Sequence, residues 1–406
     1  IDIRGHGKSE GKRGHSPFYE QLMSDIQYFI EHVTNKTSNQ KYFLYGHSMG
    51  GNLVINYSLQ KDKEINWKKR EKLLIKMLDK YRRNDGSYDC IVSGSGGKDS
   101  STIAHILKYR HNMNPLTVTY SPILYTDIGW QNQRSWINVG GFDNVLFTSN
   151  GRVTSLLAKE AFQNLLHPMQ PFKYGIKSIA AKYAIKYDVK LVMFGESYAE
   201  YGSQENRSTT SPSYDMSWFI NDSKDIFFGG THLKELKKKY QWLKDADLKP
   251  YMPLRSIEVK KSEMAVEFLG WYLKWNPQET YYYASENCGY NPDTERTDAT
   301  YGRYSAVDDK FEWLHYYCHY IKYGIGRCRF DTAQEIRNGH ITRDEAILLC
   351  KKFEGEIPNR YLIDCFDFMG LSEKQSYKII DKFRSPHLWK KKGGKWERLQ
   401  ELDELC

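Results

Sequence analysis

The chain lacks any pattern of paired cysteines. Seven cysteines are scattered over 406 residues, and no two form a Cys-x-x-Cys pair. This odd, unpatterned set argues against both a zinc knuckle and a disulfide framework, and it indicates reduced thiols in a cytoplasmic protein. The cysteines are Cys90, Cys288, Cys318, Cys328, Cys350, Cys365 and Cys406.

Long apolar runs are also missing. No stretch approaches the roughly 18 apolar residues that a membrane helix needs, so we expect a soluble protein without a membrane partner. A length of 406 residues is enough for two or more domains. The net charge of +9 and the 15% of aromatic residues suit nucleic acid and an anionic sugar nucleotide equally well. Charge alone therefore does not select a partner.

The chain has no Walker phosphate loop either, although the stretch from Tyr88 to Ser101, YDCIVSGSGGKDSS, looks like a nucleotide loop. A Walker loop needs Gly-x-x-x-x-Gly-Lys-[Ser/Thr]. Here Val92 stands where the first glycine belongs, and Asp99 replaces the magnesium-binding hydroxyl. A β-branched run, a turn of small residues and a helix start still follow one another, an order in which free backbone amides hold an anion.

The residues Ser95 to Ser100 spell Ser-Gly-Gly-x-Asp-Ser and resemble the pyrophosphate loop of the ATP pyrophosphatase (PP-loop) superfamily. The resemblance implies an enzyme that cleaves ATP between its α and β phosphates. A tight connection between a strand and a helix, with no ligand, is the structural alternative.

Residues 1 to 60 follow a different pattern. An amphipathic helix containing Leu22 to Val33 is followed by a strand candidate, Lys41 to Tyr45, and then by Gly-His-Ser-Met-Gly around Ser48. Together these resemble a slice of an α/β-hydrolase of the monoacylglycerol lipase or serine aminopeptidase type. Because no oxyanion loop precedes the slice and no Asp and His follow in the required order, we interpret Ser48 as a vestigial nucleophile in a truncated fragment.

From about residue 61 to 204, strands alternate with helices. Strands are predicted at 90–92, 116–120, 144–148 and 190–194, and helices at 67–81, 101–109 and 131–139. This alternation predicts an α/β domain with a parallel sheet covered by helices on both faces. Ligands in such folds lie at the carboxyl ends of the strands. We therefore expect the loop 93–100, the segment from Tyr120 to Asp127, and residues 195–197 to be neighbours in space.

Carboxylates follow the last of these strands. Glu196 and Glu200 lie one helical turn apart, where they could hold Mg²⁺ or position ammonia, or could stand at a solvated helix start. Asp127 is a similar but weaker candidate. His167, before Pro168, is interpreted as a structural residue at a helix end.

Residues 205 to 406 form a third predicted region, mainly helical and rich in aromatic residues. Trp271, Trp275 and Tyr281 to Tyr283 precede a polar stretch, an arrangement that a sugar site uses. For most of these aromatic residues, packing in the core or an interface is the expected role. From Asp331 to Leu399 the pattern predicts helices with a basic end.

From about Ile65 onward the chain resembles the N-acetyl sugar amidotransferases of the PP-loop superfamily, enzymes associated with acetamidino sugars in lipopolysaccharide and flagellar nonulosonic acids. Two features depart from that family: the hydrolase slice stands where paired cysteines are usual, and Ser93-Gly94-Ser95 replaces a Pro-Val-Ser type of entry. The blocks that carry the likeness are YDCIVSGSGGKDSS, MNPLTVTYSPILYTDIG, GFDNVLFTSNGRV, NLLHPMQPF, KLVMFGESYAEYG, LGWYLKWNPQETYYYASENCGY, AQEIRNGHITRDEA and DKFRSPHLWKK.

The resemblance implies ATP and Mg²⁺, with an acetamido oxygen of a nucleotide-linked sugar attacking the α phosphorus and ammonia then displacing AMP. No nucleophilic cysteine suited to a glutaminase occurs, so a separate glutaminase subunit is expected to supply ammonia. The assigned catalytic residues are Lys98, Asp99, Glu196 and Glu200, with Asp99 and Glu196 as metal ligands. The residues assigned to the nucleotide are Ser95, Gly96, Gly97, Lys98, Asp99, Ser100, Tyr120 and Asp127.

Three other interpretations stay open at this point. The chain could be a PP-loop enzyme that modifies tRNA, although nucleic acid is the less favoured partner because the paired cysteines of thiolation chemistry are absent. It could be a serine hydrolase that acts through Ser48. It could also be a chimeric product whose junction near residue 60 has no biological role.

Overall fold

The computed structural model describes residues 19–36, 65–195, 212–213, 219–223 and 225–399. It divides the chain into two units, residues 1–69 and 70–406, which are described separately. The described part of the first unit contains helix α1 (Tyr19–Lys36), which confirms the predicted amphipathic helix. The predicted strand 41–45 and Ser48 lie outside the described residues.

The second unit is built on a parallel sheet of five strands in the order β3-β2-β1-β4-β7. Val92 in β1 pairs with Thr117 in β2 and with Met193 in β4. Every residue of β2 is buried, as expected for a parallel sheet that is covered on both faces. The strands are β1 (Cys90–Ser93), β2 (Pro115–Tyr120), β3 (Asp143–Phe147), β4 (Leu191–Phe194) and β7 (Ala265–Phe268).

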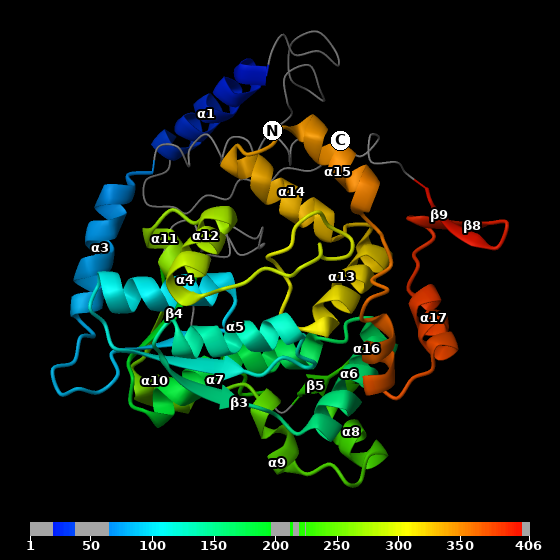
Figure 1. Cartoon of the computed structure of the whole chain (residues 1–406), viewed down its shortest axis with the longest axis horizontal. Helices are drawn as coiled ribbons and strands as arrows, with labels where there is room; N and C mark the ends of the chain where they lie inside the picture. Colours follow the sequence, from blue (N-terminus) through cyan, green and yellow to red (C-terminus); the bar gives the residue numbers. More distant parts are fainter. Residues whose placement is uncertain (1–18, 37–64, 196–211, 214–218, 224, 400–406) are drawn as a thin grey trace. The chain divides into compact units, whose positions relative to one another are not determined.

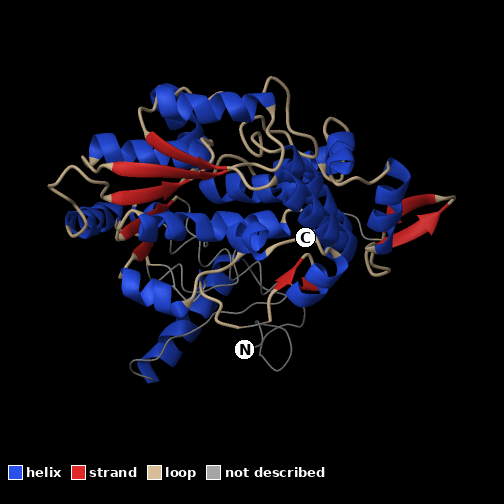
Figure 2. Cartoon of the chain, turned by 90° about the horizontal axis from the view of Figure 1, so that it is seen from below, coloured by secondary structure: helices blue, strands red, loops and turns tan. Residues whose placement is uncertain are grey.

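Helices cover both faces of this sheet (Figures 1 and 2). Successive residues of β1 enter different cores: Ile91 packs in the core that contains helix α7, whereas Cys90 and Val92 pack in the core that contains α3 and α4. This alternation follows from the period of two along a strand. The helices of this part are α3 (Trp67–Asp79), α4 (Lys98–His105) continued by a π turn (Ile106–Arg110), α5 (Asp127–Asn138), α6 (Gly151–Leu165) and α7 (Gln170–Lys186). The prediction of a parallel α/β sheet is confirmed.

Strand β7 was missed from the sequence, where the alternation of strands and helices fades after residue 205. The strand has only four residues and contains a buried acid, Glu267, so its sequence does not show the apolar pattern of a buried strand. The Glu267 carboxylate accepts hydrogen bonds from Tyr272 at 2.9 Å and Ser213 at 2.6 Å. A partnered carboxylate of this kind is tolerated inside a sheet.

The remaining elements are mainly helical, as predicted. The basic end is an exception: β8 (Trp389–Lys392) and β9 (Lys395–Arg398) form an antiparallel hairpin where helices were predicted. Gly393 and Gly394 turn it with positive φ angles of 57° and 82°. The larger helices are α12 (Pro277–Cys288), α13 (Lys310–Tyr323), α14 (Arg327–Asn338), α15 (Arg343–Phe353), α16 (Leu362–Phe368) and α17 (Glu373–Lys382). The shorter elements are β5 (Phe227–Phe228), β6 (Thr231–His232), α8 (Leu233–Lys239), α9 (Asp245–Leu248), a 3₁₀ turn (Lys249–Tyr251), α10 (Ser256–Ser262) and α11 (Leu269–Tyr272).

Candidate functional site

The small-residue loop connects the carboxyl end of β1 to the start of α4. The backbone amide of Gly94 donates to the carbonyl of Val118 at 3.0 Å, which anchors the loop to β2. Gly97 occupies the N-cap of α4 in an extended conformation, and no side chain caps the helix. The amides of the first helical turn therefore point out of the helix without an internal acceptor, which is the arrangement that binds anions.

The glycines of this loop serve different purposes. Gly96 has a positive φ of 80°, and a Cβ atom there would lie 2.8 Å from the Cα of Gln133 in α5. A Cβ on Gly94 would lie 2.0 Å from that of Ser100. Only at Gly97 is there room, since the nearest atom would be the Oγ of Ser95 at 3.7 Å. Gly94 and Gly96 are thus required by packing, and Gly97 is the position where an anion could approach the backbone.

A cavity of about 390 Å³ opens at this loop, and we call it the loop cavity. The ends of β1, β2 and β4 meet in its wall, through the loop itself, Tyr120 and Gly195. The prediction that these three strand ends are neighbours is therefore confirmed for the described residues. The opposite wall comes from residues 304–309, from Glu312 in α13 and from Arg327 in α14.

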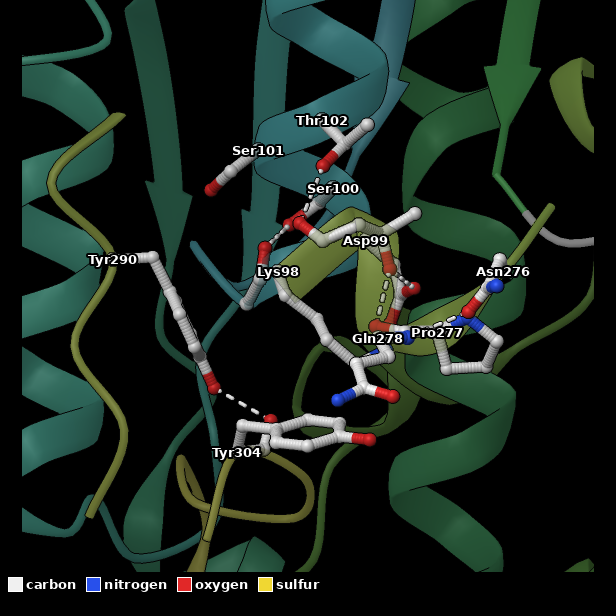
Figure 3. Close-up of polar contacts among 12 residues, drawn as sticks. Lys98, Asp99, Ser100, Ser101, Thr102, Asn276, Pro277, Gln278, Tyr290 and Tyr304 are labelled. Atoms are coloured by element: carbon white, nitrogen blue, oxygen red, sulfur yellow. Dashed lines mark hydrogen bonds and ion pairs between the residues drawn. The ribbon is translucent and has the colours of Figure 1, made fainter. Parts of the chain in front are cut away.

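Lys98 and Asp99 form an ion pair within the loop cavity (Figure 3). The Lys98 ammonium lies 2.6 Å from the Asp99 carboxylate, and Lys98 is only 5% exposed. The other carboxylate oxygen of Asp99 accepts a hydrogen bond of 3.4 Å from the Thr280 hydroxyl. A buried lysine with its counter-ion can exchange this partner for a phosphate oxygen without losing a charge partner.

Helix α12 fixes the position of α4 from the side. The Thr102 hydroxyl donates to the carbonyl of Thr280 at 3.1 Å, and the His105 ring contacts the Tyr283 hydroxyl at 2.8 Å. Trp275 is buried in the core beneath these helices. None of the aromatic residues predicted as a sugar platform lines the loop cavity in the described part of the chain. Trp271, Trp275 and Tyr283 pack in or against a core, the role expected for most of these residues, whereas Tyr282 is exposed.

Two carboxyl side chains that were not predicted from the sequence, Asp308 and Glu312, line the loop cavity. Asp308 accepts a hydrogen bond from Ser95, and burial raises its pKa. Burial, and then the charge of Asp308, raise the pKa of Glu312 to about 7. Asp309, between them, is structural because it caps α13 and accepts hydrogen bonds from the amides of Ile123 and Phe311. The sequence signal for Asp308 was its place in a pair of acidic residues, Asp308 and Asp309, directly before helix α13.

Of the other residues predicted for the site, Tyr120 alone is observed at the loop cavity among the described residues. Tyr120 lines the loop cavity, but its ring packs against Phe147 and Phe172, with ring centroids 5.5 Å away in each case. Asp127 opens α5 after its cap Thr126 and is not among the described residues that line the loop cavity. Glu196 and Glu200 lie outside the described residues.

Asp99, Asp308 and Glu312 are the cavity carboxylates that could hold Mg²⁺, since oxygen ligands suit this ion. Among the described residues, no three His, Cys, Asp or Glu side chains are grouped closely enough to form a complete metal site. A metal ion here would need phosphate oxygens or water to complete its coordination, which is usual for Mg²⁺. No helix in the described part of the chain is long and apolar enough to cross a membrane.

Comparison with known proteins finds two family matches. Residues 298–403 match the family described as LPS biosynthesis protein WbpG-like, C-terminal domain. Residues 1–68 match the family described as serine aminopeptidase, S33. A curated relative, an uncharacterized abhydrolase domain-containing protein from Dictyostelium discoideum, is 47% identical over 61 residues. That alignment covers 15% of this chain and 6% of the relative, so the chain spans only a small part of the relative's length.

Among solved structures, NMN synthetase from Francisella tularensis aligns with 74% of this chain and 96% of its own. The identity is 13% and the TM-score is 0.28, a value that does not establish a shared fold.

The matches confirm the hydrolase-like segment and the likeness of the C-terminal part to a lipopolysaccharide biosynthesis domain, and both families support an enzyme. Membership of the PP-loop superfamily stays a prediction. The far wall of the loop cavity, from Tyr304 to Glu312 and Arg327, lies within the WbpG-like match. The predicted nucleotide loop and the matched domain therefore build one cavity.

Proposed function

We propose that this chain is an ATP-dependent, AMP-forming amidotransferase that converts an acetamido group of a nucleotide-linked sugar into an acetamidino group for lipopolysaccharide or a related glycan. One observation carries the proposal. The loop Ser93 to Ser100, with its uncapped helix start, opens into a cavity whose opposite wall comes from the domain that matches a lipopolysaccharide biosynthesis family.

The charge distribution in the loop cavity supports a nucleotide bound together with a metal ion. Among the described residues that line it, Lys98 and Arg327 are the cationic side chains, and the carboxyl groups of Asp99, Asp308 and Glu312 outnumber them. In their ionised form those carboxylates repel a polyphosphate that carries no metal ion, and a metal ion beside them would favour that form. Mg²⁺ held by one or two of them together with phosphate oxygens would neutralise the departing pyrophosphate, while the amides of Ser95 to Ser100 hold phosphate oxygens.

The acetamido oxygen forms a bond to the α phosphorus of ATP, and the bond from that phosphorus to the bridging oxygen breaks, so pyrophosphate leaves with the electron pair. Ammonia then adds to the activated carbon, and the carbon–oxygen bond breaks. AMP carries away the former acetamido oxygen, and the sugar keeps an acetamidine. The chain contributes positioning and charge stabilisation, the two effects that dominate such transfers.

Ammonia is proposed to come from a glutaminase on a separate chain. The described cysteines are all buried, so none of them is exposed to attack glutamine. The isolated chain should therefore use ammonium salts but not glutamine. Equal rates with glutamine and with ammonium would contradict the separate subunit.

The decisive assay supplies ATP, Mg²⁺, ammonium and a panel of nucleotide-linked acetamido sugars, and identifies the nucleotide product by chromatography. We expect AMP and pyrophosphate to form only when an acceptor sugar is present. Formation of ADP would refute the proposal, because it would mean attack at the γ phosphorus. A matched reaction with Asp99→Asn should lose AMP formation if Asp99 helps to hold the metal ion.

Two alternatives keep their own tests. A tRNA-modifying role predicts an affinity for tRNA that falls steeply with salt. The match of residues 1–68 favours serine hydrolysis as a second candidate, which requires that Ser48 react with a fluorophosphonate.

A further inference from the structure

A second cavity of about 620 Å³ lies beside the loop cavity, and we call it the histidine cavity. Helix α13 contributes His315, His319 and Lys322 to its lining, and Lys173 in α7 and His167 before α7 also line it. His167 was interpreted from the sequence as structural, and its backbone does bridge α6 and α7 through hydrogen bonds with Ala161 and Gln170. Its ring, however, stacks on the ring of His315, with 4.6 Å between the two ring centroids.

The charge of the histidine cavity is opposite to that of the loop cavity. Its cations are Lys173, Lys322 and Arg327, and its only carboxylate among the described lining residues is Asp331. Asp331 is already paired with Arg327 at 2.8 Å. Lys322 donates to the carbonyl of Leu165 at 2.8 Å, which leaves two of its three donors for a ligand.

The histidines add unused hydrogen-bonding capacity. His315 accepts from Lys173 through Nε2 at 3.2 Å, while its buried Nδ1 has no partner, and the Nδ1 of His167 is also buried and unpaired. Buried polar atoms without a partner are rare in native structures. His167 and His315 therefore have hydrogen-bonding capacity that the protein itself does not use.

Aromatic rings stand at the same cavity. Tyr323 is 54% exposed and Phe330 is 37% exposed, and both line it. The His319 ring lies 4.7 Å from that of Tyr323 and 5.6 Å from that of Phe330. Exposed aromatic rings beside cations are the combination that stacks a nucleobase and holds its phosphates.

The two cavities share part of their walls. Tyr316, Arg327 and Gln334 line both. The Arg327 guanidinium lies over the Tyr316 ring, 4.5 Å from its centroid. On α13, Glu312 faces the loop cavity and His315 and His319 face the histidine cavity, at the spacing of one helix face. A ligand in one cavity is thus adjacent to a ligand in the other.

We propose that the histidine cavity binds the nucleoside diphosphate part of the acceptor, with its base on Tyr323 and Phe330 and its phosphates at Lys322, Lys173 and the histidines, so that the attached sugar reaches past Arg327 to the loop cavity. This inference rests on the proposed function, since it assigns the acceptor of the same reaction. It also predicts binding that needs neither ATP nor catalysis.

The test is calorimetric titration of the full chain with two probes, UDP-N-acetylglucosamine and α,β-methylene-ATP with Mg²⁺. Lys322→Met and Tyr323→Ala should each weaken the sugar nucleotide about tenfold or more and leave the ATP analogue unaffected. Tyr282→Ala is a matched control because Tyr282 is also 54% exposed but does not line the cavity. Lys352→Met is the charge control, since Lys352 stands over Phe353 at 5.1 Å much as Lys322 stands over Tyr323 at 5.0 Å.

Three results would overturn the inference: no binding of UDP-N-acetylglucosamine to the wild type, unchanged affinity in both cavity variants, or equal weakening of both probes. Titration of the same variants with pyrophosphate is a further test. If Lys322→Met weakened pyrophosphate but not the sugar nucleotide, the cavity would hold the leaving group instead. Failure of the ATP analogue to bind the wild type would refute the proposed function while leaving the result for the acceptor intact.

Proton uptake provides a second readout, which a merely structural cluster would not give. Burial, followed by the charges of Lys173 and Lys322, lowers the pKa of His167 to about 4. Burial, followed by the charges of Lys173 and the neighbouring histidines, lowers the pKa of His315. Burial also lowers the pKa of His319. The charged groups around them from α7, α13 and α14 are Lys173, Lys322, Arg327 and Asp331.

A bound diphosphate should raise these pKa values, so that binding near pH 6 takes up protons. Titrations of UDP-N-acetylglucosamine in buffers of different ionisation enthalpy measure this uptake. We expect net uptake in the wild type and less in His319→Gln. No uptake in the wild type would contradict phosphates at the histidines.

Discussion

Gly96 is the residue at which the geometry of the nucleotide loop can be tested most directly. It has a φ of 80°, and its Cα faces the backbone of α5. An added Cβ would lie 2.8 Å from the Cα of Gln133 and 2.9 Å from the carbonyl oxygen of Asn132. Gly96→Ala therefore meets a conformational cost and a steric cost together.

The size of each cost can be estimated. A left-handed conformation costs a non-glycine residue about 1–2 kcal/mol, and overpacking against backbone costs about 1–3 kcal/mol. We expect Gly96→Ala to lower the free energy of unfolding by about 2–5 kcal/mol, or to shift the loop and release part of that strain. A shifted loop would lose two or more charge-assisted hydrogen bonds to phosphate, which weakens ATP roughly 100-fold or more.

Gly339 provides the matched control. It also has a positive φ, 75°, but no atom lies within 4 Å of the position of an added Cβ. Gly339→Ala should therefore show only the conformational cost and leave ATP binding unchanged. Urea unfolding of both variants and titration with α,β-methylene-ATP measure the difference. Equal stability and equal affinity of the two variants would refute the packing of the loop described above.

Three further predictions concern other parts of the chain. Burial raises the pKa of Glu312 from 4.5 to about 7, so between these pH values the folded protein keeps a proton on Glu312 that the unfolded chain releases, and stability falls as the pH rises from 4.5 to 7. Glu312→Gln should therefore flatten the dependence of melting temperature on pH. An unchanged slope in this variant would contradict the raised pKa. Asn132 is buried, and its side-chain amide makes two hydrogen bonds of 2.8 Å with the backbone of Asn291. Asn132→Ala should therefore lower the free energy of unfolding by about 2–3 kcal/mol in chemical unfolding. A decrease smaller than that of a typical surface substitution would show that Asn132 does not join these two segments. A fluorophosphonate should not label Ser48 in the full chain, with Ser48→Ala as the blank, and labelling that is lost on boiling would establish the hydrolase.

Much of the sheet could be predicted because local sequence carried it. Strands β1 and β4 are short apolar runs bounded by turn residues, and β2 combines apolar residues with β-branched threonines, a composition typical of parallel strands that are buried on both faces. Strand β7 carried no such signal because its buried Glu267 depends on Tyr272 and Ser213 for partners. The basic hairpin at the end of the chain was predicted as helix because lysine is favourable in helices, although Gly393-Gly394 marked the turn.

The sequence alone determined the loop, since glycines, an acid and a hydroxyl at fixed spacing after a strand constrain the backbone locally. It also determined that this loop lies beside Tyr120 and Gly195, because the carboxyl ends of parallel strands share one edge. Only the tertiary structure decided what faces the loop. Asp308, Glu312 and the histidines of α13 are far from it in sequence, and no local pattern records that α13 and α14 close one cavity with the loop and a second cavity beside it.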